Sequence, residues 1–369
     1  MASDRRHDLD ALRVFAFLLL ILYHVGMFYV PWGWHVKSVH APIEVLEMPM
    51  RLTNGWRLPL LFFISGVALR FALDKAPHGP FLRRRVWVLL VPLLFGMYVI
   101  CAPQTWHELR QGGIEPGTVL TFYRGYADWP WSSPEGWPMI TPTWNHLWYL
   151  LYMLVYSVVI ILASWAARGA LERRLSPLAG SRTLVSMIPV IHVSLLFLMQ
   201  DSVGRAQTLY GDWFNLLTSF LICLFGYGVA KEAEFWDLLK RLRGVMLFAA
   251  LVLSVCVAVL SISEAAWQVA LAVRILQGWI VIWALLGWAQ VLVTGPSPLL
   301  TYLSGAIFTY YVLHQTVIIM VGVPLSGLGL PATVEAVILI IGTGAVCWAG
   351  YEFLARRIGR FGVLLGARN

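Results

Sequence analysis

Two polar side chains, Arg13 and His24, interrupt the first long apolar run, which includes residues 10–28 (DALRVFAFLLLILYHVGMF). The run continues to about residue 31, which is long enough for a helix to cross a bilayer. The two residues are eleven positions apart, so they share one helix face and lie ~16 Å apart along the axis. Asp10 precedes Arg13 by three positions and is within reach of an ion pair. A surface cation and a deeper proton-transfer group suit chemistry across a membrane.

The same residue types also allow plain structural interpretations. Arg13 can extend its guanidinium to water at the membrane surface, and His24 can hydrogen-bond to a neighbouring helix. His314 is a second histidine within an apolar run, and it too is either a hydrogen-bonding partner between helices or a functional residue. Arg274 lies inside another such run and requires a partner or a water-filled cavity, which favours a pocket inside the protein.

Membrane helices are the elements that must position these side chains. Of the 369 residues, 59% are hydrophobic and only 12% are charged, and the mean hydropathy is +0.73. A soluble domain carries roughly twice that charged share. We therefore expect an all-α fold, a polytopic membrane helix bundle in which residues 1–369 form a single integral membrane domain. About ten spans are expected, at residues 11–31, 56–73, 86–102, 146–167, 184–200, 213–230, 244–262, 267–293, 299–323 and 331–353.

Arginine and lysine collect in alternate connections, notably at residues 83–85, 173–174 and 240–243, and near both termini. This asymmetry predicts a multi-pass protein of a bacterial inner membrane with both termini in the cytoplasm. The net charge of +8 therefore reflects topology in a lipid bilayer, and no nucleic acid partner is expected. The four cysteines lie in or beside apolar runs without metal-ligand spacing, so no metal site is expected.

Aromatic and polar side chains gather in the segments expected outside the membrane. Residues 103–145 form the longest loop, which is rich in proline and glycine and has no helical or strand periodicity. An interfacial aromatic belt explains such residues, and so does a platform on which indole rings stack against sugar rings. Those at the mouths of the first and fourth spans are Trp32, Trp34, His35, Trp144, His146 and Trp148.

Two further features lie near the second and third spans. Ser65 and Gly66 form a small pair inside an apolar run, which lets another helix approach closely. The turn that follows this run carries Arg83, Arg84 and Arg85. These arginines are either a positive-inside signal or a grip on the phosphates of a nucleotide-bearing substrate.

Several motifs together resemble one family. The stretch LDALRVFAFLLLILYH, in which ten residues separate the arginine from the histidine, resembles the first-helix signature of the acyltransferase family 3 membrane proteins. FFISG, FLRRRVWVLLVP, HLWYL and YYVLHQTVI are similar to further motifs of that family, and they follow in order along the chain. The arginine turn is more compact than the spaced form common elsewhere. Trp34 to Ser38 resemble the members that add succinyl groups to periplasmic glucans.

The resemblance implies an O-acyltransferase that moves an acyl group, succinyl in preference to acetyl, from cytoplasmic acyl-coenzyme A to a hydroxyl of a periplasmic glucan. Acyl-coenzyme A is a co-substrate, and no permanently bound cofactor is expected. His24 would act as general base, with Arg13 and Asp10 as the other catalytic residues. The expected donor-binding residues are Arg83, Arg84, Arg85, Ser65, Arg274, His314 and Tyr311. The expected acceptor-binding residues are Trp32, Trp34, His35, Glu47, Trp144, His146 and Trp148.

Other classes of protein remain open at the level of the sequence. A transporter or exporter of a glycan or acyl compound also needs many spans and intramembrane polar residues. A sensor or scaffold is less favoured, because no motif resembles a signalling domain. The sequence leaves open whether transfer is direct or passes through an acyl-enzyme, and whether the protein forms a homo-oligomer.

The distribution of arginine predicts the sidedness of two connections. Residues 103–145 should face the periplasm and residues 74–85 the cytoplasm. In a cysteine-free variant, single cysteines placed in each connection should differ in intact cells, with an impermeant maleimide labelling only the first. Equal labelling of both would contradict this topology.

Overall fold

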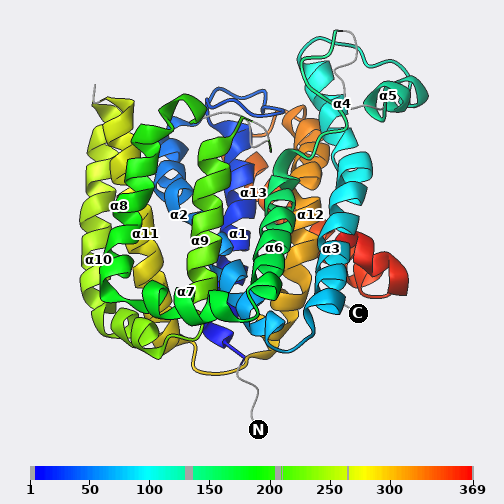
Figure 1. Ribbon diagram of the computed structural model, residues 1–369. Helices are drawn as coiled ribbons and strands as arrows, with labels where there is room; N and C mark the ends of the chain where they lie inside the picture. The colour runs from blue at the N-terminus through cyan, green and yellow to red at the C-terminus, as the bar shows by residue number, and fades with distance from the viewer. Residues whose placement is uncertain (1–4, 129–135, 204–208, 210, 264–265, 368–369) are drawn as a thin grey trace. The chain divides into compact units, whose positions relative to one another are not determined.

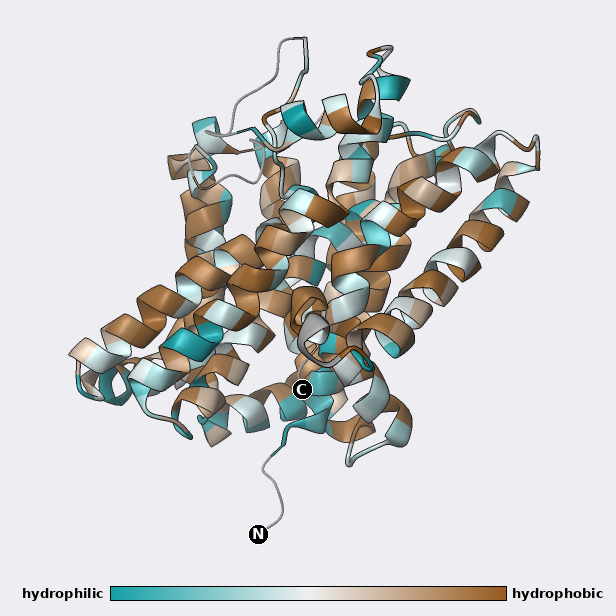
Figure 2. Cartoon of the chain, turned by 90° about the vertical axis from the view of Figure 1, so that its right-hand side faces the viewer, coloured by the Kyte–Doolittle hydropathy of each residue, from teal (hydrophilic) through white to brown (hydrophobic). Residues whose placement is uncertain are grey.

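The computed structural model describes residues 5–128, 136–203, 209, 211–263 and 266–367 (Figure 1). All regular secondary structure in these ranges is helical, which confirms the all-α class. Among the described residues, eight helices are long and apolar enough to cross a membrane, and a bent pair makes a ninth if it is counted as one span. Figure 2 shows hydrophobic residues over most of the helical ribbon.

The chain forms two compact units, which we describe separately. Unit 1 comprises Met1–Ala16, Met48–Val86 and Tyr152–Ser304. Unit 2 comprises Phe17–Glu47, Trp87–Leu151 and Gly305–Asn369. Four helices are divided between the two units, namely α1 (His7–Tyr29), α3 (His78–Phe95), α6 (Trp148–Ala166) and α12 (Pro298–Ser326), and a fifth, which begins at Glu47, has only that first residue in unit 2.

Most of unit 1 consists of long apolar helices. They are α2 (Glu47–Leu73), α8 (Arg182–Leu198), α9 (Trp213–Val229), α10 (Ala233–Ile262) and α11 (Trp267–Leu292). The unit also contains the short polar helix α7 (Ala170–Gly180) and the 3₁₀ helix η4 (Gln200–Ser202). Helices α10 and α11 pack along one another (Figure 1). On α10 the apolar side chains of Phe248, Val255 and Ile262 are exposed. An apolar helix with exposed apolar residues along its length is typical of a lipid-facing position.

A close approach of α2 to α9 depends on glycine. A Cβ atom at Gly66 would lie 1.9 Å from the carbonyl oxygen of Cys223, and one at Gly226 would lie 2.2 Å from that of Phe63. Only residues without a side chain allow this backbone contact, which is the packing expected for the small pair in FFISG. Phe63 itself is fully buried beside Phe225, Phe235 and Trp283.

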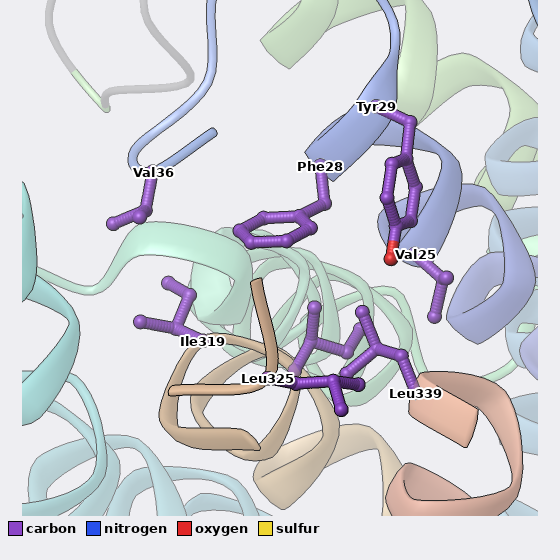
Figure 3. Packing of buried hydrophobic residues seen from close by; sticks show 8 residues of the cluster. Val25, Phe28, Tyr29, Val36, Ile319, Leu325 and Leu339 are labelled. Atoms are coloured by element: carbon purple, nitrogen blue, oxygen red, sulfur yellow. The ribbon is translucent and has the colours of Figure 1, made fainter. Parts of the chain in front are cut away.

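Unit 2 contains the outer connections and the C-terminal helices. Its remaining elements are η1 (Glu44–Leu46), η2 (Gly96–Ile100), α4 (Ala102–Gln111), α5 (Val119–Tyr126), η3 (Asn145–Leu147), α13 (Ala332–Ala349), η5 (Gly350–Ala355) and η6 (Gly359–Leu365). Of these, η2 and η5 are π-helical turns. A buried cluster joins α1, the segment after it, α12 and α13, with Phe28 and Tyr29 beside Leu325 and Leu339 (Figure 3).

One expectation about the outer segments was wrong. The loop at 103–145 was expected to lack helices, but it contains most of α4 and all of α5. Thr118 begins α5, because its hydroxyl accepts a hydrogen bond from the backbone N–H of Thr121. Phe122 and Tyr126 then bury one face of this short helix, a pattern that the many turn residues around it conceal in the sequence.

The expected spans each coincide with an apolar helix, but several bounds differ. The second begins at Glu47 instead of residue 56, and the seventh at Ala233 instead of residue 244. The third is part of a helical segment that continues from His78 to Gln111. The fifth and sixth match α8 and α9, which have only 17 residues each, and α8 is bent by 87° from α7. Polar residues extend these helices beyond the apolar runs that marked them.

The glycine contact of α2 with α9 predicts the effect of a single methyl group. Gly66→Ala should lower the free energy of unfolding of the purified protein by about 1–3 kcal/mol. The added methyl group would collide with backbone atoms, which cannot move aside as a flexible side chain does. Gly244→Ala on α10 is the matched control, since a Cβ there meets nothing within 4 Å. Equal melting temperatures for the two variants would refute the close contact.

Candidate active site

Two histidines from distant parts of the sequence meet in unit 2. His24 Nδ1 on α1 lies 2.9 Å from His314 Nε2 on α12, and the ring centroids are 5.0 Å apart. The other ring nitrogen of His314, Nδ1, lies 2.7 Å from the carbonyl oxygen of Tyr311. His314 is fully buried, whereas His24 is only partly buried and so keeps some access to its surroundings.

These contacts determine where the protons lie in the neutral pair. A carbonyl oxygen can only accept, so His314 Nδ1 must carry a proton and donate it to Tyr311. In neutral His314 the Nε2 atom is then an acceptor, and His24 Nδ1–H donates to it. The remaining ring nitrogen of His24, Nε2, therefore holds a lone pair. A histidine held in this tautomer is suited to accept a proton at Nε2, because its partner stabilises the resulting cation.

Trp34 covers the ring of His24. The two rings are nearly parallel, with an interplanar angle of 21° and centroids 6.4 Å apart. Trp34 also contacts the edge of Phe28, which belongs to the buried cluster of α1. An expected acceptor-binding residue and the expected base are thus neighbours, an arrangement that the sequence does not reveal because a turn separates them.

His146 lies on the other side of His314, with ring centroids 5.0 Å apart at 85°. It is buried, its Nε2–H donates to the carbonyl oxygen of Val312, and its Nδ1 lies 3.5 Å from Gln104 Nε2. The hydroxyl of Tyr311 donates to the backbone carbonyl of His146 at 2.6 Å. His146 and Tyr311 therefore pack against His314 in the interior, and their assignments to acceptor and donor binding stay predictions.

Gln104, a fully buried residue on α4, links the segments around the histidines. Its carbonyl oxygen accepts hydrogen bonds from Asn145 at 2.8 Å and Gln315 at 3.0 Å. Its amide group donates to Thr316 at 2.6 Å, and Thr316 in turn donates to the carbonyl oxygen of Ile100 in the π-turn η2. A buried amide with these partners fixes α4, η3 and α12 together, because leaving any one unpaired is costly in a membrane protein.

The segment after α1 is held by three further polar contacts. Trp32 Nε1 donates to Glu47 at 2.7 Å, so two expected acceptor-binding residues bond to each other. His35 Nδ1 lies 2.7 Å from a carboxylate oxygen of Glu108 on α4, and both side chains are partly exposed. The ammonium group of Lys37 donates to three carbonyl oxygens at the C-terminal end of α1, although burial lowers its pKa.

Glu335 on α13 anchors the far end of the same segment. Its side chain is fully buried, and its oxygens accept hydrogen bonds from Tyr29 and Ser38 and lie 2.9 Å from His40 Nε2. Residues 32–40 are therefore fastened at both ends, which keeps Trp34 in place against His24. Trp144 and Trp148, the other expected acceptor residues, flank η3 and are partly buried.

The remaining expected residues belong to unit 1. Arg13 forms the expected ion pair with Asp10 at 3.0 Å, and Asp10 also contacts Arg5. Arg83 and Arg84 are exposed on α3, whereas Arg85 is partly buried and donates to Ser157 at 3.1 Å. Ser65 and Arg274 are partly buried, and Arg274 lies against Gly55 of α2. Their assignment to donor binding stays a prediction.

Gln104, Glu108 and Lys37 are the polar residues of this region that the sequence analysis missed. The first two follow the third apolar run with helical spacing, four positions apart, which was a signal that the helix continues outward. The partners of Gln104 and Glu108 are 41 to 212 residues away and carried no such signal.

The network around Gln104 predicts a loss of stability on mutation. Gln104→Leu should destabilise the protein by about 1–3 kcal/mol, because Asn145, Gln315 and Thr316 would lose a buried partner. Gln111→Leu on the same helix is the control, since its bonds to the backbone of Lys37 are exposed. Thermal unfolding in detergent measures both, and a larger loss for Gln111→Leu would contradict the role given to Gln104.

Relatives of the chain were found by comparison with known proteins. Residues 6–352 match the family Acyl_transf_3, an acyltransferase domain. Glucans biosynthesis protein C of Salmonella typhimurium (strain LT2) is 25% identical over 188 residues, which is 50% of this chain and 46% of that protein. The protein of the same name from Escherichia coli (strain K12) is 25% identical over 171 residues, 46% of this chain and 42% of that protein. No solved structure is significantly similar.

The alignments with these relatives span about half of their length, so their activity does not transfer by itself. The family match is different, because it extends over nearly the whole chain and includes every motif from the first helix to His314. It confirms the resemblance of the motifs, and the apolar helices agree with it. This chain is a multi-pass membrane protein that belongs to the Acyl_transf_3 family of acyltransferase domains.

Proposed function

We propose that this protein transfers an acyl group to a hydroxyl of a carbohydrate, with His24 as general base. The observation that carries the proposal is the hydrogen-bonded pair of His24 and His314, in which His314 also donates to the carbonyl oxygen of Tyr311. That arrangement leaves the lone pair on His24 Nε2, which is the atom that a base needs. The membership of the acyltransferase family supports the reaction class.

In the proposed reaction, one atom, His24 Nε2, carries out both proton transfers. His24 Nε2 removes the proton from the acceptor hydroxyl as its oxygen attacks the thioester carbonyl. The carbon–sulfur bond then breaks, and the leaving thiolate takes the proton from His24 Nε2, so that an ester and a free thiol are formed. During these steps His314 Nε2 keeps the hydrogen bond from His24 Nδ1 and holds the ring in place. A direct transfer of this kind is the simplest scheme that the pair supports.

A carbohydrate acceptor is supported by the residues around His24. Trp34 stacks on the histidine ring, and the partly exposed Trp32 and His35 follow on the same segment. Indole faces pack well against sugar rings, and His35 and Glu108 offer hydrogen bonds to hydroxyl groups. Because the relatives are named for glucan biosynthesis, we propose a periplasmic glucan as the acceptor.

For the donor we propose acyl-coenzyme A, with succinyl preferred to acetyl, from the resemblance of the motifs. The exposed guanidinium groups of Arg83 and Arg84 are available to phosphates. From the positive-inside distribution we propose that this end faces the cytoplasm, in a bacterial inner membrane, with both termini on the same side. An outer glucan and an inner donor would then reach the protein from opposite sides.

Three variants test the role of the histidine pair. With purified protein, radiolabelled acyl-coenzyme A and glucan, His24→Ala should lower ester formation by on the order of 10²–10⁴-fold, the usual contribution of a general base. His314→Leu should also lower it, because the Nδ1–H of His24 then has no acceptor at that position. His314→Gln should restore part of the rate, since its amide oxygen can accept in place of Nε2.

The same assay separates this proposal from transport. Near-normal ester formation by His24→Ala would overturn the proposed base. If wild-type protein in vesicles moves a glycan across the membrane without forming an ester, the protein is a transporter and the proposed reaction is wrong. If His314→Gln is as inactive as His314→Leu while both fold normally, the partner of His24 has another role.

A further inference from the structure

A polar cavity of about 300 Å³ lies within unit 1, away from the histidine pair in the sequence and in its contacts. The end of α2, the start of α3, the end of α6 and the start of α7 line it, through Arg70, Asp74, His78, Ser164, Glu172 and Arg173. Its size is at the lower limit of known ligand pockets. These elements belong to the connections that are expected to face the cytoplasm.

A chain of hydrogen bonds orients Glu172 in this cavity. The hydroxyls of Ser164 and Tyr227 both donate to Glu172 Oε1. Because Ser164 has only one proton to give, His78 Nε2, at 3.2 Å, must donate to the Ser164 oxygen. The other carboxylate oxygen, Glu172 Oε2, is buried and has no hydrogen-bond partner within the described ranges. A buried carboxylate oxygen without a donor is costly, and a ligand with a hydroxyl or amino group would satisfy it.

The charged residues of the cavity are only partly paired with one another. Asp74 is paired with both Arg70 and Lys231. Arg70 also lies over the ring of Tyr227, with the guanidinium carbon 5.6 Å from the ring centroid. Arg173 is exposed, and its guanidinium group lies beside Gly169. It forms no ion pair in the described part of the chain. Arg70 and Arg173 balance Asp74 and Glu172 in the lining, and Arg173 is the guanidinium most available to an anionic ligand.

We propose that this cavity binds a phosphate ester that carries a hydroxyl or amino group beside the phosphate. Arg173 and Arg70 would contact the phosphate oxygens, for which the planar guanidinium fork is well matched. The neighbouring hydroxyl or amino group would donate to Glu172 Oε2. Inorganic phosphate satisfies only the first requirement, so we expect it to bind more weakly than a phosphorylated sugar or glycerol.

Two sources supply such chemistry on the cytoplasmic side. One is the nucleotide end of the acyl donor, a ribose phosphate, and this source alone rests on the proposed function. The other is the glycerol phosphate headgroup of an anionic lipid, since basic pockets between membrane helices bind such headgroups. Adenosine 3′,5′-bisphosphate is the probe for the first source. Nanodiscs of phosphatidylglycerol, compared with nanodiscs of phosphatidylcholine, are the probe for the second.

The test measures binding to the full-length purified protein without turnover. Bisphosphate affinity is determined by thermophoresis, and lipid binding by the rise in melting temperature in phosphatidylglycerol. At least one probe should bind, and Arg173→Ala should weaken it about tenfold or more, the usual effect of losing a charge-assisted contact. Glu172→Gln should weaken the same probe but leave binding of inorganic phosphate unchanged.

Arg174→Ala is the matched control, because Arg174 is exposed on the same helix and does not line the cavity. It should stay within about twofold of the wild type. The proposal is overturned if neither probe binds, or if Arg173→Ala and Glu172→Gln bind like Arg174→Ala. His24→Ala should bind each probe as the wild type does, so a failure of the proposed reaction and a failure of this cavity give different results.

Discussion

The hydrogen bond from His314 Nδ1 to the carbonyl oxygen of Tyr311 determines the chemistry of unit 2. Water is scarce in the interior of a membrane protein, so each buried polar atom must find its partner within the chain. This bond uses the one proton of neutral His314 and leaves its Nε2 as an acceptor. The tautomer of His24 follows, and so does the position of the lone pair that could act as a base. Tyr311 contributes through its backbone, and its hydroxyl holds His146 on the far side of the same ring.

The surrounding network keeps that pair in place by similar bonds. Gln104 fills all of its hydrogen-bonding capacity with Asn145, Gln315, Thr316 and His146. The segment that carries Trp34 is tied at one end by the bond of Trp32 to Glu47 and at the other by the bonds of Ser38 and His40 to Glu335. His24, which is partly exposed, is thus surrounded by side chains that have little freedom to move. This order is typical of a site whose groups must be held before the substrate arrives.

Much of the fold could be predicted from the sequence, because apolar length and small residues act locally. The ten apolar runs coincide with helices, the pair of Asp10 with Arg13 forms, and Gly66 makes its close contact. The contacts of the site could not be predicted, since they join residues such as His24 and His314, 290 positions apart. The sequence also concealed α5, whose start depends on one threonine hydroxyl in a stretch rich in turn residues. The residue type of His146 suggested that it binds the acceptor. Its burial could not be predicted, because burial depends on neighbours that only the fold supplies.

The paired glycines of unit 1 limit how that unit can change shape. Because the backbones of α2 and α9 touch at Gly66 and at Gly226, neither helix can rotate about its axis without a collision. A shift by one residue would place Ser65 or Val67 at the position of Gly66, or Phe225 or Tyr227 at that of Gly226. The two helices must therefore move as one rigid body. Any opening of unit 1 during a reaction cycle would have to take place at other helix contacts, such as the bend between α7 and α8.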